Sequence, residues 1–164
     1  MSENQNVEYK SLRFLKPNST NWDELAKDCV CLANARGGHI YIGIEDKASL
    51  PPPNQIINDK TIINEIQKRI AERTINVAVI VIVQIAANKA EFIDIEVVRN
   101  VQTIASTTDG RYYVRVSDVC RPVPPDEMAR LAAEKNAFVW EDQTTKKCLQ
   151  RRLTLRKNKH FLTI

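Results

Sequence analysis

The sequence predicts an α+β fold in which helices pack on a mixed, mainly antiparallel sheet. Some segments alternate polar and apolar residues as strands do, others repeat apolar residues at helical spacing, and their order is β, α, β, α, four strands and a closing helix. The 164 residues, 43% of them hydrophobic, suffice for one buried core and exclude collagen-like and wholly disordered classes. We expect one domain over residues 1–140 and a basic tail over residues 141–164.

The first half of the chain supplies strand, helix and strand. "VEYKSLRFL" alternates and predicts a first strand, which "KPNSTN" ends. From Trp22 to Ala33 apolar residues recur at helical spacing, with Thr20 or Asn21 as the expected N-cap. The helix is expected to stop at Gly37 and Gly38, because glycine adopts the left-handed conformation that ends helices. The following "HIYIGIED" predicts a strand.

The second half begins with three consecutive prolines that no regular element accommodates. "NDKTIINEIQKRIAER" predicts a helix capped by Asn58 or Asp59, with Ile62, Ile66 and Ile70 on one face.

Strands are expected next, and then a last helix. Residues 77–86 and 92–98 are expected to form an antiparallel hairpin in the core, the first as a buried strand because of its β-branched content. "VQTIAS" and "RYYVRV" flank the turn "TTDG" and predict a second hairpin. "VPPDEMARLAAEK" predicts the closing helix, with proline near its first turn.

The sequence favours a cytoplasmic protein. The first twenty residues contain no apolar stretch of signal-peptide length, and the longest apolar run, residues 75–87, is shorter than the roughly 18 residues that span a bilayer. We expect no membrane contact and reduced cysteines, because nothing indicates an oxidising compartment. Their spacing fits no metal-thiolate site, so no metal is expected there. The cysteines are Cys29, Cys31, Cys120 and Cys148.

Positive charge is concentrated at the C-terminus. Residues 1–145 carry 17 basic and 20 acidic side chains, a net charge of −3, although the whole chain is +4. The basic residues of the tail are Lys146, Lys147, Arg151, Arg152, Arg156, Lys157 and Lys159. Such a tail binds phosphate backbones by counterion release, or is simply a solvated terminus.

Three stretches together resemble the Schlafen AlbA-like domain family: "VEYK", "LANARGGHIYIGIEDK" and "GRYYVRVSDVCRPVPPDEMARL". The second is similar to the family's Ala-Asn-x-x-Gly-Gly helix end and the strand that follows it. In the third, Val116-Ser117 stands where the family usually has Gly-Ser. The resemblance covers roughly residues 3–135.

The resemblance implies a nucleic-acid-binding domain, often the front end of bacterial transcriptional regulators. In animal Schlafen proteins two such lobes cleave structured RNA. The family also carries a divergent ATP-binding label, but the sequence has no G-x-x-x-x-G-K-[ST] loop, so no ATP cofactor is expected.

Nuclease members of the resembled family use three carboxylates, which match Glu3, Glu8 and Asp46 here. Hard oxygen ligands of this kind would hold Mg²⁺ or Mn²⁺ and activate a water. Against catalysis, a five-residue offset on a regular strand points Glu3 and Glu8 to opposite faces. A structural ion pair between Glu8 and Lys10 is the alternative.

We expect a module that binds nucleic acid, DNA above RNA, through phosphate contacts and without catalysis or cofactor, within a transcriptional regulator. A metal-dependent ribonuclease and a protein-interaction module, forming a homodimer through an exposed strand, are the alternatives. Arg36 has a second interpretation as a partner of the helix dipole. The expected phosphate contacts are Lys10, Arg13, Lys16, Arg36, Lys47, Arg111 and Arg115.

Overall fold

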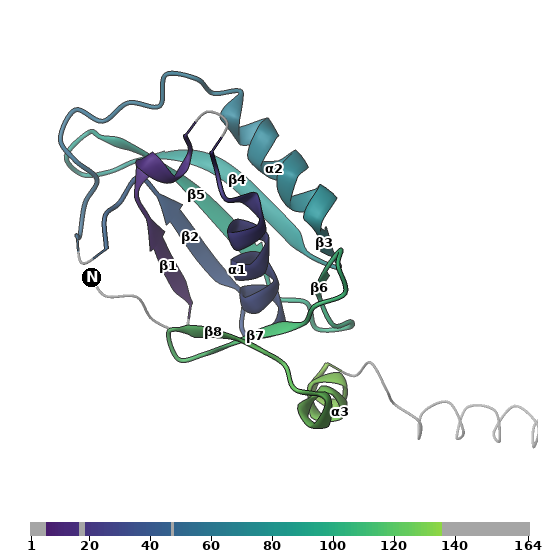
Figure 1. Ribbon diagram of the computed structural model, residues 1–164. Coiled ribbons are helices and arrows are strands. Elements are labelled where there is room, and N and C mark those ends of the chain that lie inside the picture. Colours follow the sequence, from purple (N-terminus) through teal and green to yellow (C-terminus); the bar gives the residue numbers. More distant parts are fainter. Residues whose placement is uncertain (1–5, 17–18, 47, 136–164) are drawn as a thin grey trace, which may run out of the picture.

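The structure is a computed structural model that describes residues 6–16, 19–46 and 48–135 (Figure 1). Its elements, in chain order, are β1 (Val7–Lys10), η1 (Leu12–Phe14), α1 (Trp22–Asn34), β2 (Gly38–Ile42), α2 (Ile62–Arg73), β3 (Thr74–Ile75), β4 (Ala78–Ile85), β5 (Glu91–Val98), β6 (Ser106–Thr107), β7 (Tyr113–Val116), β8 (Val119–Pro122) and α3 (Pro125–Glu134).

A four-stranded sheet in the order β1-β2-β5-β4 forms the centre of the fold. β1 runs parallel to β2, whereas β2 with β5 and β5 with β4 pair antiparallel. The predicted mixed, mainly antiparallel α+β fold is therefore confirmed. Two smaller two-stranded pairs, β3 with β6 and β7 with β8, complete the described strands.

Helices α1 and α2 cover one face of this sheet (Figure 1). Alternate strand residues point toward them, so that Ile40 on β2 lies opposite Ile95 on β5, which in turn lies opposite Val81 on β4. These side chains pack with Leu25 of α1 and Ile66 of α2 in one buried cluster. The opposite face of the sheet carries the intervening residues of each strand.

The predicted helices form close to the expected limits. Asn21 caps α1, because its side-chain oxygen accepts from the backbone N–H of Glu24. Helix α2 starts later than expected, with Thr61 at its N-cap, whose N–H donates to the carboxylate of Asp59 at 2.9 Å. The predicted inner face of α2 is confirmed by the burial of Ile66 and Ile70. No helix among the described residues combines the length and apolarity needed to cross a membrane.

Three strand predictions need correction. The first strand stops at Lys10, and η1 replaces its second half. The predicted hairpin of residues 77–86 and 92–98 exists as β4 and β5, but β4 is an edge strand, not a buried one. Thr107–Gly110 does form a turn, with Gly110 N–H donating to Thr107, yet its flanks pair elsewhere: β6 with β3, and β7 with β8.

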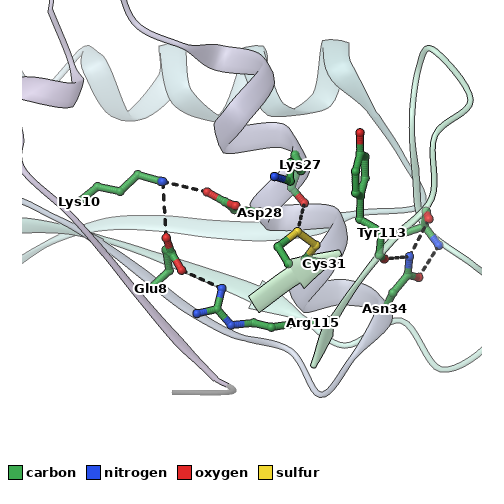
Figure 2. The surroundings of a disulfide bond; sticks show 10 residues. Glu8, Lys10, Lys27, Asp28, Cys31, Asn34, Tyr113 and Arg115 are labelled. Carbon is green, nitrogen blue, oxygen red and sulfur yellow. Dashed lines mark hydrogen bonds and ion pairs between the residues drawn. A yellow bond between two sulfur atoms is a disulfide. The ribbon is translucent and has the colours of Figure 1, made fainter. Parts of the chain in front are cut away.

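The expectation that all the cysteines are reduced is wrong. Cys31 of α1 and Cys120 of β8 form a disulfide across a sequence separation of 89, with a Cα–Cα distance of 5.8 Å (Figure 2). Cys29 is a free, fully buried thiol, and burial raises its pKa. The pairing escaped sequence analysis because it depends on β8 crossing α1, which spacing does not reveal.

Candidate nucleic-acid interface

The family-like motif at the end of α1 is structural. Asn34, the last residue of α1, is 4% exposed and uses its whole amide group. Its Nδ2 donates to the carbonyls of Ala105 and Tyr113 at 2.8 Å each, and its Oδ1 accepts from the N–H of Ala105 at 2.8 Å. Asn34 therefore joins α1 to β7 and to the segment before β6, and it does not reach a ligand.

The two glycines of the motif permit a close approach that no larger residue allows. Gly37 has a φ of +73°, and a Cβ placed there would lie 2.8 Å from the carbonyl oxygen of Val97. A Cβ on Gly38 would overlap the carbonyl of Asn6, which accepts from His39 N–H at 2.8 Å. The glycine pair thus lets α1 turn directly into β2 beside both neighbouring strands.

Glu8, Lys10 and Arg115 come together in an ion network between the sheet and α1 (Figure 2). Arg115 donates to Glu8 at 2.7 Å and to the carbonyl of Val7 at 3.2 Å, and its side chain is 1% exposed. The ammonium of Lys10 lies 3.6 Å from Glu8 and 2.9 Å from Asp28 of α1. The predicted Glu8–Lys10 ion pair is present. Arg115 and Lys10, two expected phosphate contacts, are buried and occupied by carboxylates.

Burial and charge oppose each other at the Lys10–Asp28 pair. Burial lowers the pKa of Lys10, but the charge and hydrogen bonds of Asp28 and Glu24 outweigh it, so the net pKa is raised and the ammonium stays protonated. Burial raises the pKa of Asp28 although Lys10 acts against it. Asp28 Oδ2 lies 2.9 Å from the ammonium nitrogen of Lys10. The network therefore fixes β1 against α1 at an appreciable cost in desolvation.

The three expected catalytic carboxylates are not seen together. Glu3 lies outside the described residues. Glu8 belongs to the ion network, and Asp46 is exposed in the loop after β2. Within the described ranges no three Asp, Glu, His or Cys side chains are placed to hold a metal ion.

The remaining expected phosphate contacts are spread over the surface. Arg13 and Lys16 are exposed on and just after η1, whereas Arg36 is exposed at the opposite end of α1. Arg111 is 71% exposed in the turn before β7 and forms an ion pair with Asp109 at 3.0 Å. Lys47 is outside the described residues. These cations do not form a single patch.

One group of cations does form at the C-terminal end of α1. Arg36 precedes Gly37, and a Cβ on Gly37 would lie 3.4 Å from the Cβ of Arg99, so the backbone segments that carry the two arginines meet here. Both are exposed, and neither has a carboxylate partner among the residues that the structure describes. We call Arg36, Arg99 and Lys135 the arginine corner.

Lys135 links the end of α1 to the segment after β5 by hydrogen bonds. It follows α3, and its Nζ donates to the carbonyl of Ala33 at 3.0 Å and to the carbonyl of Asn100. The N–H of Asn100 also donates to Ala33. Burial and the nearby charge of Arg99 lower the pKa of Lys135 to about 8. Sequence analysis missed Arg99 and Lys135, because only the pairing of β2 with β5 brings Arg99 to the end of α1, and only the hydrogen bonds to Ala33 and Asn100 bring Lys135 there.

A second cluster of polar side chains, formed by His39, Asp94 and Gln84, lies on the sheet face opposite the helices. His39 Nδ1 is 2.9 Å from Asp94 Oδ1, and Gln84 donates to the other carboxylate oxygen at 3.2 Å. The ring of Tyr41 stacks on His39 and meets Phe92 edge-on. His39 had no expected partner in sequence, since Asp94 is 55 residues away and only the strand register places it there. These side chains include no lysine or arginine that would attract phosphate.

Comparison with known proteins agrees with the motifs. The family model described as "Schlafen, AlbA_2" matches residues 3–124. The fold is similar to the crystal structure of the DIP2311 protein from Corynebacterium diphtheriae, with a TM-score of 0.56 and 26% sequence identity. That similarity covers 78% of this chain but only 27% of the other, so this chain spans about a quarter of that protein's length. No curated protein matches the sequence. The chain belongs to the Schlafen AlbA_2 family.

Proposed function

We propose that this chain is a nucleic-acid-binding domain that contacts the phosphate backbone through the arginine corner. The observation that carries the proposal is that Arg36 and Arg99 occupy the same end of α1, each exposed and with no carboxylate partner in the described part of the chain. Guanidinium groups bind phosphate oxygens through paired hydrogen bonds. Family membership, which indicates a nucleic-acid-related domain, supports the same function.

The contacts of α1 favour a phosphate role for Arg36 over a role at the helix dipole. A helix C-terminus attracts a cation to its free carbonyl groups. Here Lys135 and the N–H of Asn100 already donate to Ala33. The N–H of Gly37 donates to Leu32 at 2.8 Å. The carbonyls of Leu32 and Ala33 are satisfied by these groups, which favours a ligand as the partner of the exposed Arg36.

The sequence of the basic tail also supports the proposed binding of phosphates. The chain passes from α3 to Lys135 and then into the sequence that contains seven tail cations within residues 146–159. These cations therefore follow the arginine corner along the chain. DNA as the preferred ligand, and a setting in transcriptional regulation, rest on the family resemblance alone and are part of the proposal.

A salt titration tests the proposal. Fluorescence anisotropy with labelled duplex DNA and RNA of one sequence, at about 50 and about 200 mM salt, measures how steeply affinity falls with salt. For duplex DNA each lost phosphate contact lowers the slope of log affinity against log salt by about 0.9. Arg36→Gln/Arg99→Gln is expected to lower it by about 1.8 and to weaken binding to all sequences alike.

The matched control removes two exposed cations elsewhere. Lys60→Gln/Lys68→Gln changes the net charge by the same amount, in the turn before α2 and in the middle of α2. The control is expected to keep the salt slope of the unmodified chain. An equal loss of slope in both variants, or no binding at low salt, would contradict the proposal.

The nuclease alternative lacks a supporting observation of this kind. A metal ion at Glu8 would have to displace Arg115 at 2.7 Å and Lys10 at 3.6 Å from the carboxylate. Incubation with structured RNA and Mn²⁺ tests this alternative directly. Cleavage that Glu8→Ala abolishes would establish it in place of simple binding.

A further inference from the structure

The two edges of the central sheet differ in their protection. β1, at one edge, has four residues and includes the charged Glu8 and Lys10. β4, at the other edge, has eight residues, "AVIVIVQI", with no charge and no proline. Its eight residues pair one to one with β5, from Ala78 opposite Val98 to Ile85 opposite Glu91, so it contains no bulge.

An edge of this kind is normally avoided in monomeric proteins. Natural sheets protect edge strands with charges, proline, bulges or short length, because free N–H and C=O groups recruit another strand. On β4 the sheet order leaves one side without a strand partner among the described residues. Short length and charged residues protect β1, whereas β4 has none of the usual protections.

Exposed aliphatic side chains gather around the same edge. Ile80 is 51% exposed, Ile82 is 44% exposed, and Ile85, at the end of β4, is 69% exposed. Ile80 and Ile82 lie on the sheet face opposite the helices, and Val98, which is 44% exposed, extends the stripe on the neighbouring strand. An apolar stripe bordering an open strand edge is typical of an association surface.

We propose that two copies of this chain associate through β4, strand against strand and antiparallel, to form one continuous eight-stranded sheet. This inference is independent of nucleic-acid binding. A second copy is the partner that fits, because antiparallel pairing of a strand with itself is two-fold symmetric and closes after two copies. The uncharged sequence of β4 places no like charges opposite each other in any register.

The helix beside the edge is compatible with this arrangement. α2 packs on β4, so the two copies of α2 would approach each other on one face of the joined sheet. Its charged side chains are two acids and three bases, and each base has an acidic partner, since Lys68 and Arg69 pair with Glu65 and Glu72 and Arg73 pairs with Asp23 at 3.1 Å.

The available area is that of a modest dimer interface. A strand of eight residues is about 27 Å long, at about 3.4 Å per residue. A sheet layer with a helix layer behind it is roughly 20 Å thick. The edge therefore offers on the order of 500 Å² per copy, or about 1,000 Å² in total, near the lower limit for a specific interface. We expect dissociation in the micromolar range.

Sedimentation of the full chain, without nucleic acid, tests the dimer. Across concentrations spanning the micromolar range the unmodified chain is expected to shift from monomer to dimer. Ile82→Lys puts a charge on the joined strands and is expected to remain monomeric throughout. Val119→Lys is the matched control, since Val119 is a 59% exposed aliphatic residue on β8, and it is expected to dimerise normally.

Cysteine cross-linking tests the strand pairing itself, and it does not depend on a destabilising charge. Single substitutions Ile80→Cys, Ile82→Cys and Gln84→Cys lie at successive positions on one face of β4. Under mild oxidation, the position nearest the two-fold axis is expected to form a covalent dimer most rapidly. A chain that stays monomeric, forms species larger than a dimer, or dimerises unchanged after Ile82→Lys would overturn the proposal.

Discussion

Arg115→Met removes a guanidinium group that is 1% exposed and that donates to Glu8 at 2.7 Å and to the carbonyl of Val7 at 3.2 Å. Removing one partner of a buried ion pair costs about 3–5 kcal/mol, because the other charge remains buried and unpaired. Glu8 is 15% exposed and keeps Lys10 at 3.6 Å, which places the expected loss near the low end, at about 3 kcal/mol. That is a large fraction of the stability of a typical domain.

Urea unfolding followed by far-ultraviolet circular dichroism measures this loss. The midpoint is expected to fall with the slope m unchanged, because the surface exposed on unfolding stays the same. Glu8→Met/Arg115→Met removes both charges and is expected to recover most of the loss, since an apolar pair can replace a buried ion pair. Arg130→Met, at a position 71% exposed, is the control and is expected to change stability by less than about 0.5 kcal/mol.

The same variant separates two roles for Arg115. As a buried partner of Glu8, Arg115 does not touch phosphate, so Arg115→Met is expected to leave the salt slope of DNA binding unchanged wherever the variant is folded. A stability loss below about 0.5 kcal/mol, together with a fall in salt slope of about 0.9, would refute this reasoning and make Arg115 a phosphate contact.

Three further predictions concern the scaffold. Asn34→Ala is expected to lower the free energy of unfolding by about 3 kcal/mol, because three buried hydrogen bonds are lost, and a loss below about 1 kcal/mol in urea unfolding would contradict the role given to Asn34. Reducing the Cys31–Cys120 disulfide is expected to cost about 4.5 kcal/mol for a loop of this separation, and the Cys31→Ser/Cys120→Ser variant should show the same stability with and without reductant. The pKa of Lys135 is lowered to about 8, so this side chain binds more protons in the unfolded chain between pH 8 and 10.5, and its own contribution to stability is expected to rise with pH in that window, while the raised pKa of the Cys29 thiol acts in the opposite direction above pH 9.0. In urea titrations this rise should disappear in Lys135→Met; an unchanged rise would assign it to another group.

Local patterns predicted the elements well. Helical spacing from Trp22 and the capping role of Asn21 depend only on neighbouring residues, and both appear in the structure. The hairpin of β4 and β5 likewise follows from two alternating segments and the short turn between them. The turn at Gly110 also formed as expected, but its flanking strands do not pair with each other: β6 pairs with the distant β3, and β7 pairs with β8, the next strand in the chain.

The candidate site was less predictable because strand register and helix packing assemble it. Arg115 looks like an exposed cation in sequence, and only the packing of β7 against α1 and β1 buries it on Glu8. Arg99 follows β5 without any motif, and the pairing of Gly38 with Val97 brings it to Arg36. Glu8 with Lys10 was foreseeable, since two residues on one strand face are neighbours whatever the fold.

For the proposed binding of phosphates, the position of each cation therefore matters more than the total number of cations in the chain. Residues 1–145 are slightly acidic as a whole, so binding to phosphates depends on a local group of cations or on the tail. The arginine corner offers such a group within the described residues. The contribution proposed for residues 146–164 can be measured separately.

The most direct measurement is the salt dependence of duplex DNA binding by the chain ending at residue 145, with and without Arg36→Gln/Arg99→Gln. Without the tail the slope is expected to become shallower but to remain measurable, and the double substitution should lower it by a further 1.8 or so. Binding that disappears entirely with residues 146–164, or that the double substitution leaves unchanged, would contradict the assignment of the arginine corner as the nucleic-acid interface.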